Sequence, residues 1–214
     1  MANICCDVDG TLTNFEDFVL KYGYVFLKRK YKLENLMINY EGYDLDEVFL
    51  NERLENFFLE NYSMSVDDVL SYFWNVYYVR YVCEKLKKGS NVFFKELCER
   101  DKLLITTSRK KSTSNSILGT FVRKTIKAQL KLGGIPFDEI HFFENDDDKV
   151  DFIKSLKPIL VFDDKPQIIE TLSDEIDGVV CINSSYNNNY SLNALRINQY
   201  DNLSLEKVKK LRRI

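Results

Sequence analysis

Histidine and glycine are scarce in this sequence, and each scarcity excludes a class of catalytic site. The only histidine is His141, so a Ser-His-Asp or Cys-His mechanism would have to run through that one residue. It lies in the strand-like stretch DEIHFF, where we expect it to belong to the core or to a strand end. The 8 glycines form neither a GxGxxG fingerprint nor a Walker loop. Any chemistry in this chain is therefore expected from carboxylates.

An excess of charge of one sign is also lacking. The chain has 30 Lys and Arg against 33 Asp and Glu, which gives a net charge of -3 and no electrostatic reason to expect nucleic-acid binding. No apolar run approaches the roughly 20 residues of a membrane span. The 214 residues are 45% hydrophobic and 14% aromatic, which predicts a folded chain with a substantial core.

Neither a signal-peptide pattern nor a cysteine-pair motif is present. The 5 cysteines are an odd number, are scattered and include no CxxC pair. The first residues lack a basic region followed by an apolar stretch and a small-residue cleavage site. We therefore expect a cytoplasmic protein whose cysteines are buried free thiols.

From about residue 90 onward, β-rich runs alternate with helical patterns, which is typical of parallel βαβ units. Together with the opening run NICCDV, they predict an α/β fold with a doubly wound parallel sheet and helices on both faces. The further expected strands are residues 102–107, 139–143, 159–162 and 178–183. The expected helices are residues 91–100, 119–132, 149–156, 166–176 and 204–213, the last capped at Ser204.

The segment between the first strand and residue 90 has a different pattern. It is helix-leaning, dense in Phe and Tyr, and contains no convincing alternating strand. We interpret residues 12–89 as a helical domain inserted after the first strand, with the stretch KKGSN as its return hinge. Residues 1–11 and 90–214 then form the main domain. The aromatic side chains are mostly expected to form the inserted domain's own core, because a small helical unit needs bulky residues.

Polar side chains gather where the predicted strands end. Because ligands bind at the carboxyl ends of parallel strands, near the point where strand order reverses, we expect these side chains to share one edge of the sheet. Paired carboxylates at this edge form a hard-oxygen cluster suited to Mg²⁺, and a cation would allow them to coexist. The residues expected at this edge are Asp7, Asp9, Thr107, Ser108, Arg109, Lys149, Asp163 and Asp164.

This set resembles the haloacid dehalogenase (HAD) superfamily. The sequence DVDGT, residues 7–11, matches its first motif, and Thr107, Lys149 and the pair 163–164 match the other three in order. The resemblance covers residues 3–12 and about 90–200, and implies a HAD-like Rossmannoid sheet with a helical C1-type cap. More narrowly, LLITTSR, KVDFIKSLKPILVFDDKP and VVCINSSYN are similar to the 5'(3')-deoxyribonucleotidase-like family and its bacterial relatives, with Ser108 in place of the alanine of TAR.

The residue types fit phosphate-ester hydrolysis. Asp7 is placed to attack phosphorus and form an aspartyl-phosphate, and its reference pKa near ~3.9 predicts an ionised carboxylate without help. Asp9 can protonate the leaving alkoxide and then deprotonate the hydrolytic water, a task that halide departure would not require. Thr107 and adjacent amides would hold the phosphoryl oxygens, while Lys149 neutralises charge.

The remaining site residues are expected to bind metal or substrate. Asp164 is the predicted direct Mg²⁺ ligand beside Asp7, with Asp163 behind it or bonded to Lys149. The resemblance also implies a contact between the metal and the backbone carbonyl of Asp9. Gly10 lets the chain turn close to the phosphate. Ser108 and Arg109 are candidates for substrate contact, although an arginine in the run RKK is equally well explained as solvated. A base could stack on aromatic residues of the insertion such as Phe15, Phe18, Tyr40 or Tyr43.

The sequence thus predicts a Mg²⁺-dependent phosphatase of small phosphate monoesters, most specifically a 5'-nucleotidase of (deoxy)nucleoside monophosphates. One alternative keeps the chemistry but takes a sugar phosphate or a nucleic-acid end as substrate. Another is a catalytically silent binding protein with the same fold. The intact set of Asp7, Asp9, Thr107, Lys149 and the acidic pair favours an enzyme.

Overall fold

The computed structural model describes residues 1–33, 36–49 and 52–211, which divide into two compact units. The first unit combines Met1–Asn14 with Lys85–Ile214, and the second is Phe15–Glu84. Residues 12–14 and 85–88 belong to the first unit because the two segments pair with each other. The backbone N–H of Lys87 donates to the carbonyl of Leu12 at 2.8 Å, and Thr13 forms an antiparallel bridge with Leu86.

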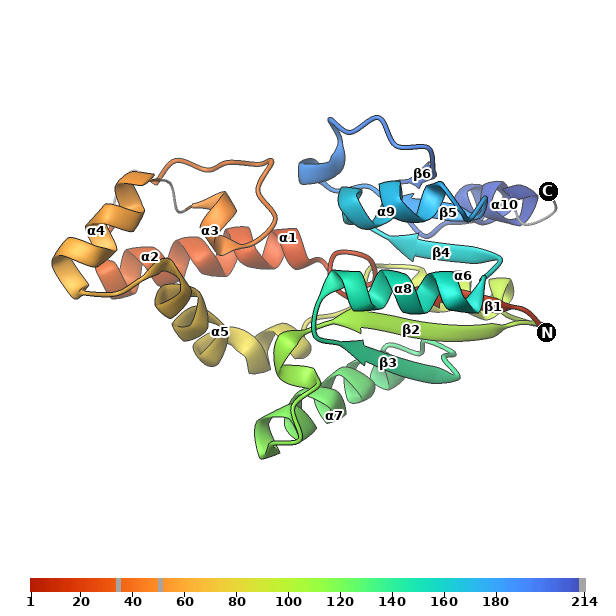
Figure 1. Cartoon of the computed structure of the whole chain (residues 1–214), viewed down its shortest axis with the longest axis horizontal. Helices are drawn as coiled ribbons and strands as arrows, with labels where there is room; N and C mark the ends of the chain where they lie inside the picture. The colour runs from red at the N-terminus through yellow and green to blue at the C-terminus, as the bar shows by residue number, and fades with distance from the viewer. Residues whose placement is uncertain (34–35, 50–51, 212–214) are drawn as a thin grey trace. The chain divides into compact units, whose positions relative to one another are not determined.

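The first unit is built on one six-stranded sheet in the order β3-β2-β1-β4-β5-β6, in which every neighbouring pair is parallel (Figure 1). This confirms the predicted doubly wound sheet. The sixth strand was not predicted, because three residues are too few for their alternation of apolar and polar side chains to be recognised as a strand. The strands are β1 Asn3–Cys6, β2 Lys102–Ser108, β3 Glu139–Phe143, β4 Leu160–Asp163, β5 Val179–Ile182 and β6 Leu195–Ile197.

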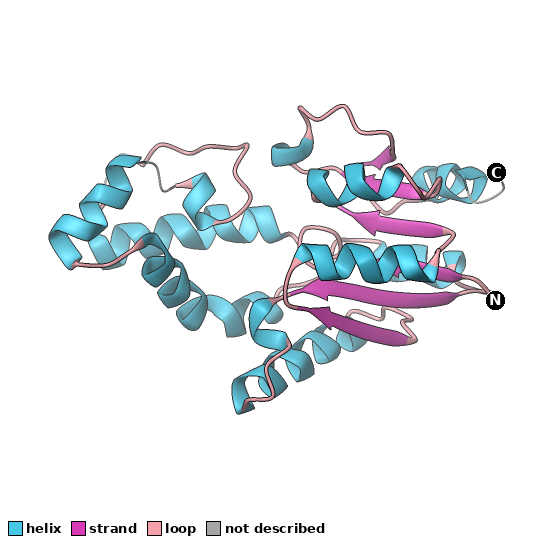
Figure 2. Ribbon diagram, in the orientation of Figure 1, coloured by secondary structure: helices cyan, strands magenta, loops and turns pink. Residues whose placement is uncertain are grey.

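Helices cover both faces of this sheet (Figure 2). On one face, α8 and α9 bury Ile153 and Ile169 against the strand residues Cys5 and Val161. On the other face, Phe93 and Phe94 of α6 pack against Phe162 of β4. The helices of this unit are α6 Ser90–Leu97, α7 Ile117–Leu132, α8 Asp146–Leu156, α9 Pro166–Ser173 and α10 Asn202–Leu211, with 3-10 turns at Lys110–Ser112 and Ser185–Asn187.

Local capping explains where several of these helices begin. The side chain of Asn145 accepts the N–H of Asp148 at 2.8 Å, which starts α8 within the predicted acidic run. Pro166 occupies the first turn of α9, where its missing N–H costs nothing. The predicted cap of the last helix was wrong. Because α10 begins at Asn202, its cap is Asp201, whose carboxylate accepts the N–H of Ser204 at 2.8 Å.

The topology fixes the position of the site. β1 lies between β2 and β4, with Cys6 paired to Ile105 on one side and to Phe162 on the other. The chain runs outward from β1 in opposite directions through these two neighbours, so this is the point where strand order reverses. The residues that follow β1, β2 and β4 therefore meet at one edge.

The second unit is helical, and no strand is present in its described residues, 15–33, 36–49 and 52–84. Its core is largely aromatic, with Phe18, Phe26, Phe58 and Phe73 buried together. The side chains of Ser65 and Asp68 form a capping box that starts its longest helix. The elements are α1 Phe15–Phe18, a π-helix Val19–Gly23, α2 Tyr24–Tyr31, α3 Leu45–Val48, α4 Glu52–Tyr62 and α5 Val66–Val82.

Aromatic packing around α5 gives the first prediction. Replacing Phe73, which is fully buried, by Ala should lower the free energy of unfolding of the helical unit by about 3–5 kcal/mol, because a large cavity remains. Denaturant unfolding followed by the fluorescence of Trp74, the only tryptophan, reports on this unit. The matched control is Val76→Ala on the same helix, an exposed position where a change within about 0.5 kcal/mol is expected. Equal losses in the two variants would contradict the assigned core.

Asp44 makes the stability of the helical unit depend on pH. Its carboxylate caps α3 by accepting the N–H of Leu45 at 2.6 Å, and it also bonds with Trp74. Burial raises the pKa of Asp44 to about 6, against the opposing effect of the Leu45 N–H.

A pKa that is higher in the folded state than in the unfolded state means that the folded state holds the proton more tightly. The contribution of Asp44 is therefore fully present below about pH 4 and is lost as the pH rises through about 6. Between pH 4 and pH 7, we expect the free energy of unfolding of the wild-type protein, followed by Trp74 fluorescence, to decrease. The decrease should exceed that of Asp44→Asn by up to about 3 kcal/mol. Parallel pH profiles of the two proteins would contradict this assignment.

Candidate active site

The polar residues predicted at the strand ends lie at the carboxyl edge of the sheet, and five of them are almost inaccessible to solvent. Asp7 directly follows β1, and its N–H donates to the carbonyl of Phe162 on β4 at 2.9 Å. That bond brings Asp7 alongside Asp163, the last residue of β4. Burial of so many polar groups together requires that they neutralise one another. The exposed fractions are 5% for Asp7, 1% for Thr107, Lys149 and Asp163, and 0% for Asp164.

Lys149 joins two of these carboxylates. Its Nζ donates to Asp7 Oδ1 at 2.7 Å and to Asp163 Oδ2 at 2.7 Å, so the expected contact between Asp163 and Lys149 is present. Burial disfavours the ammonium, but the carboxylates of Asp163 and Asp7 outweigh it and raise the pKa of Lys149. The lysine therefore stays charged inside the protein.

The expectation that Asp7 is ionised without help was wrong. Burial raises the pKa of Asp7 well above its ordinary value, and Lys149 opposes that effect only in part. The neighbouring carboxylates of Asp163 and Asp164 raise it further. Asp7 thus depends on nearby positive charge to stay a carboxylate.

Asp163 and Asp164 have different surroundings. Both oxygens of Asp163 are engaged, since Oδ1 accepts the N–H groups of Asp164 at 2.9 Å and Lys165 at 3.0 Å, and Oδ2 accepts Lys149. Asp164 instead accepts the Thr11 hydroxyl at 2.6 Å on Oδ1 and the Tyr186 hydroxyl on Oδ2. Burial, followed by repulsion from Asp163, raises the pKa of Asp164 to about 7. Asp164 therefore lacks a cationic hydrogen-bond donor of the kind that Lys149 provides to Asp163.

Asp9 forms an ion pair with Arg109. The guanidinium donates through Nε to Asp9 Oδ2 at 2.6 Å and through Nη2 to Oδ1, a two-pronged arrangement that fits a carboxylate. The side chains are only 12% and 15% exposed, so Arg109 is not a solvated arginine. The structure thus settles the local surroundings of Arg109, which the sequence left open.

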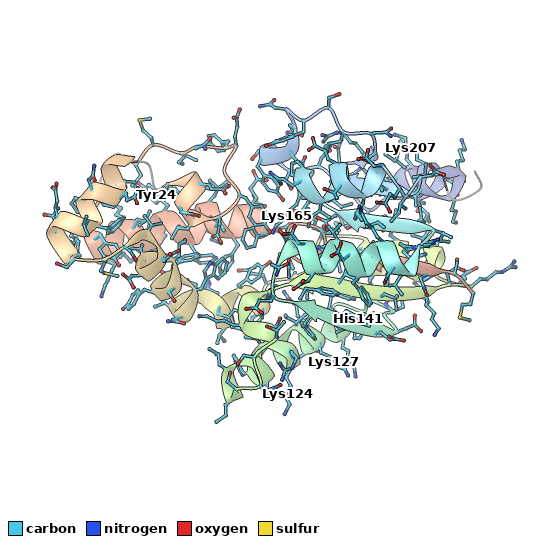
Figure 3. All side chains as sticks on the ribbon, in the orientation of Figure 1. Tyr24, Lys124, Lys127, His141, Lys165 and Lys207 are labelled. Carbon is cyan, nitrogen blue, oxygen red and sulfur yellow. The ribbon has the colours of Figure 1, made fainter. Side chains whose placement is uncertain are left out.

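Ser108 is engaged at the rim of the site. Its hydroxyl donates to Asp146, the first residue of α8, and Lys165 Nζ donates to the other oxygen of Asp146 at 2.8 Å. Figure 3 labels Lys165, which follows the acidic pair in the sequence. A substrate that contacts Ser108 would therefore meet an existing network of a hydroxyl, a carboxylate and an ammonium.

Gly10 has a backbone conformation that explains the glycine in the first motif. Its φ of +78° is rare for other residues, and a Cβ here would collide with the carboxyl of Asp164. Its carbonyl accepts a hydrogen bond from Lys87 Nζ. The glycine thus allows the loop after β1 to approach Asp164 closely.

The hydroxyl of Thr107 lies at the carboxyl end of β2. Its Oγ1 is buried and has no hydrogen-bond partner among the described residues, a property that it shares with Oγ1 of Thr106. Most buried hydroxyls are paired, so an unpaired one at the carboxyl end of a strand is available to an incoming acceptor.

The predicted aromatic contacts lie in the helical unit. Phe18 is 3% exposed, and its ring packs against Tyr22 and Tyr81 at centroid distances of 4.5 Å and 4.9 Å. Phe15 is also buried, and it stacks on Tyr43 at 4.7 Å. A base could therefore reach Phe18 only if these neighbours moved. Tyr40, by contrast, is exposed.

His141 lies on β3, as its strand-like surroundings predicted. Its Nε2 is 3.1 Å from Glu139 Oε2, and its ring packs against Phe152 of α8 with a centroid distance of 4.5 Å. These contacts are structural and involve none of the strand-end carboxylates described above.

Several residues of this network were not predicted from the sequence. Thr11 ends the first motif and Lys165 follows the acidic pair, so their positions alone could have suggested a role. Lys87, in the predicted hinge, and Tyr186, in the stretch VVCINSSYN, carry no catalytic motif and are brought to the site by tertiary structure. The unpredicted residues are Thr11, Lys87, Asp146, Lys165, Tyr186 and Asn187.

The surroundings of Asp7 and Asp164 fit a magnesium ion with few protein ligands. Across the described residues, no group of three or more His, Cys, Asp or Glu side chains is arranged to bind a metal by itself. Mg²⁺ commonly uses only one or two carboxylates, with waters and substrate phosphate completing the shell. The pKa values of Asp7 and Asp164 are raised first by burial and then by neighbouring carboxylates, and a bound cation would oppose both effects. Asp163, whose oxygens are engaged, fits a supporting position.

Comparison of the whole chain with solved structures places it among proteins with the HAD-like fold. A haloacid dehalogenase-like hydrolase from Streptococcus pneumoniae is 16% identical with a TM-score of 0.59, and the match covers 98% of both chains. A phosphonoacetaldehyde hydrolase-like protein from Oleispira antarctica is 13% identical with a TM-score of 0.62, covering 99% of this chain and 92% of the other.

A third match is the HAD hydrolase YfnB from Bacillus subtilis, bound to magnesium. It is 15% identical with a TM-score of 0.60, and the match covers 100% of this chain and 99% of the other. No family model matches the sequence, and no curated protein matches it significantly. At these identities the likeness establishes the fold, and the chemistry has to be argued from this chain's own residues.

The buried ion pairs of Lys149 give a stability prediction. Lys149→Met removes the ammonium but keeps most of the volume, and leaves Asp7 and Asp163 buried without it. We expect the free energy of unfolding to fall by about 3–5 kcal/mol, measured by denaturant titration with circular dichroism. Lys154→Met on the same helix is the control, because its ion pair with Glu175 is solvent-accessible and should contribute at most about 1 kcal/mol. Similar losses in the two variants would contradict this prediction.

Proposed function

We propose that this protein is a Mg²⁺-dependent phosphatase of small phosphate monoesters, acting through an aspartyl-phosphate on Asp7. The observation that carries this proposal is the pairing of a buried carboxylate, held by Lys149, with the partnerless hydroxyl of Thr107 on the neighbouring strand. A nucleophile and a hydrogen-bond donor at adjacent strand ends suit a phosphoryl group, because one attacks its phosphorus while the other binds its oxygens. The HAD-like fold and the order of the sequence motifs agree with it.

In the first step, Asp7 attacks phosphorus while the bond from phosphorus to the alkoxide oxygen breaks. Lys149 holds Oδ1 of Asp7, so Oδ2 is the oxygen proposed to form the new bond. Thr107 donates to a phosphoryl oxygen, and the departing alkoxide takes a proton from Asp9. In the second step Asp9 accepts a proton from water, whose oxygen attacks phosphorus and releases Asp7 and phosphate.

Arg109 has a role in this scheme because it pairs with Asp9 in the absence of substrate. A guanidinium bound to both carboxylate oxygens favours the ionised form, which does not suit the acid that the first step needs. Two oxygens of a phosphoryl group are the other partner that a guanidinium binds through a pair of hydrogen bonds. We therefore assign Arg109 to substrate binding. When its guanidinium moves from Asp9 to the phosphate, Asp9 is able to carry a proton. Ser108 and the backbone at Gly10 complete the proposed phosphate surroundings.

Asp7 and Asp164, with the backbone carbonyl of Asp9, are the proposed protein ligands of magnesium. When bound, the ion supplies positive charge that reduces repulsion between the carboxylate nucleophile and the phosphoryl oxygens. This role accounts for a pair of buried carboxylates whose pKa values are raised in the absence of a cation.

The finer proposal is a nucleoside monophosphate as substrate. It is supported by the similarity of three sequence stretches to the 5'(3')-deoxyribonucleotidase-like family. A sugar phosphate is the alternative with the same chemistry.

A cytoplasmic location is proposed from the cysteines, all of which are free thiols. Cys5, Cys6 and Cys181 are buried as expected, but Cys83 is exposed and Cys98 half-buried. Among the helices that the structure describes, none has the length and apolar character that crossing a membrane requires.

The test is phosphate release from deoxy- and ribonucleoside monophosphates, sugar phosphates and a generic aryl phosphate, with Mg²⁺ or with EDTA. We expect Mg²⁺-dependent activity that Asp7→Asn lowers by on the order of 1000-fold or more, because the nucleophile is lost. Asp151→Asn, an exposed carboxylate on α8, is the control and should behave like wild type.

The outcomes separate the two levels of the proposal. Hydrolysis of nucleotides in preference to the other esters supports the nucleotidase assignment. Activity confined to sugar phosphates or to the aryl phosphate rejects that substrate but keeps the mechanism. The absence of activity on every ester with Mg²⁺ would favour the silent binding protein instead.

A further inference from the structure

The segment between β5 and β6 makes direct contact with Asp164. Tyr186, in the 3-10 turn Ser185–Asn187, is 5% exposed, and its hydroxyl donates to Oδ2 of Asp164. The hydroxyl of Thr11 donates to Oδ1 at 2.6 Å. A donor on each oxygen fixes the rotation of the carboxyl group, while each oxygen keeps a lone pair for another partner.

The next residue holds the backbone of Asp164. Asn187 is fully buried, and its Nδ2 donates to the carbonyl of Asp164 at 2.8 Å and to that of Ile182 at 2.9 Å. Its Oδ1 accepts the N–H of Ser184 at 3.1 Å. One short turn thus contacts both the side chain and the main chain of Asp164.

Arg196 on β6 ties this turn to the sheet. Its Nη1 donates to Asn183 Oδ1 at 2.8 Å, and its Nη2 donates to the carbonyls of Asn187 at 2.9 Å and Tyr190 at 2.7 Å. These bonds span both ends of the 3-10 turn. The position of Tyr186 is therefore set by a hydrogen-bonded network rather than by one contact.

We infer that Tyr186 is a positioning residue for metal binding, which orients the carboxylate of Asp164 toward the cation. This inference rests on the proposed function, because it takes Asp164 to be a magnesium ligand. Groups that hydrogen-bond to a metal ligand commonly set its orientation, and their loss weakens metal affinity about 10–100-fold. Tyr186 acts through Asp164 and needs no contact with the substrate.

Tyr200 provides a comparison inside the same protein. It is also 5% exposed, and its hydroxyl donates to the backbone carbonyl of Thr11 at 3.0 Å, with no carboxylate oxygen as acceptor. Removal of either hydroxyl deletes buried hydrogen bonding near the site, with Asp164 and Ser184 at Tyr186 and with Thr11 at Tyr200. Only the loss at Tyr186 removes a donor from Asp164, so the two variants separate positioning from general destabilisation.

The experiment measures binding of Mn²⁺ alone, as a stand-in for Mg²⁺, to substrate-free protein by the electron paramagnetic resonance signal of the free ion. We expect Tyr186→Phe to weaken Mn²⁺ affinity about 10–100-fold. Tyr200→Phe and Tyr190→Phe, the latter an exposed tyrosine of the same segment, should bind like wild type. Asp164→Asn serves as the reference for loss of the proposed ligand, and circular dichroism confirms that each variant is folded.

The results distinguish this inference from the proposed function. If Asp164→Asn loses Mn²⁺ binding while Tyr186→Phe binds like wild type, Tyr186 does not position the ligand, although the metal site stands. Equal weakening in Tyr186→Phe and Tyr200→Phe would also overturn the inference, because any buried hydroxyl would then have the same effect. Wild-type affinity in Asp164→Asn would remove the proposed ligand itself, and the inference with it.

Discussion

The contact of the Lys149 ammonium with Asp7 and Asp163 is the constraint on which the rest of the site depends. It allows two carboxylates to be buried side by side at the ends of β1 and β4, which without a cation would repel each other. It also requires α8 to begin close to those strand ends. The N-terminal cap at Asn145 and the packing of Ile153 against the sheet determine that position. The lysine thus links helix placement, sheet order and the chemistry of Asp7.

Charge around this contact is distributed in pairs. Arg109 binds Asp9 and Lys165 binds Asp146, while the carboxylate of Asp164 accepts the hydroxyls of Thr11 and Tyr186. Burial, followed by repulsion from Asp163, raises the pKa of Asp164. Under the proposed function, a phosphate ester that enters this site competes for cations that already have carboxylate partners. The same pairing lets the substrate-free protein bury these charges at a tolerable cost.

The sheet and the strand-end residues could be predicted because their signals are local. Continuous apolar runs mark buried parallel strands, and Asp7, Thr107 and Asp163 directly follow or end such runs. The contacts of Tyr186 and Lys87 could not be predicted, because they depend on where the β5–β6 segment and the hinge return to the sheet. The raised pKa of Asp7 was missed for a related reason. Burial by surrounding elements sets it, and a reference value for an exposed aspartate contains none of that information.

The residues on the two sides of β1 differ in the kind of group that they can bind. On the β2 side, Thr107 and Arg109 provide donors that suit phosphoryl oxygens. On the β4 side, Asp164 is the proposed ligand of a cation, with Tyr186 bonded to its carboxylate and Asp163 held by Lys149. Asp7 lies between them because its strand is the one from which the chain runs in both directions. A nucleophile at that point can face an anion and a cation together, so the reversal of strand order is itself what makes this chemistry available.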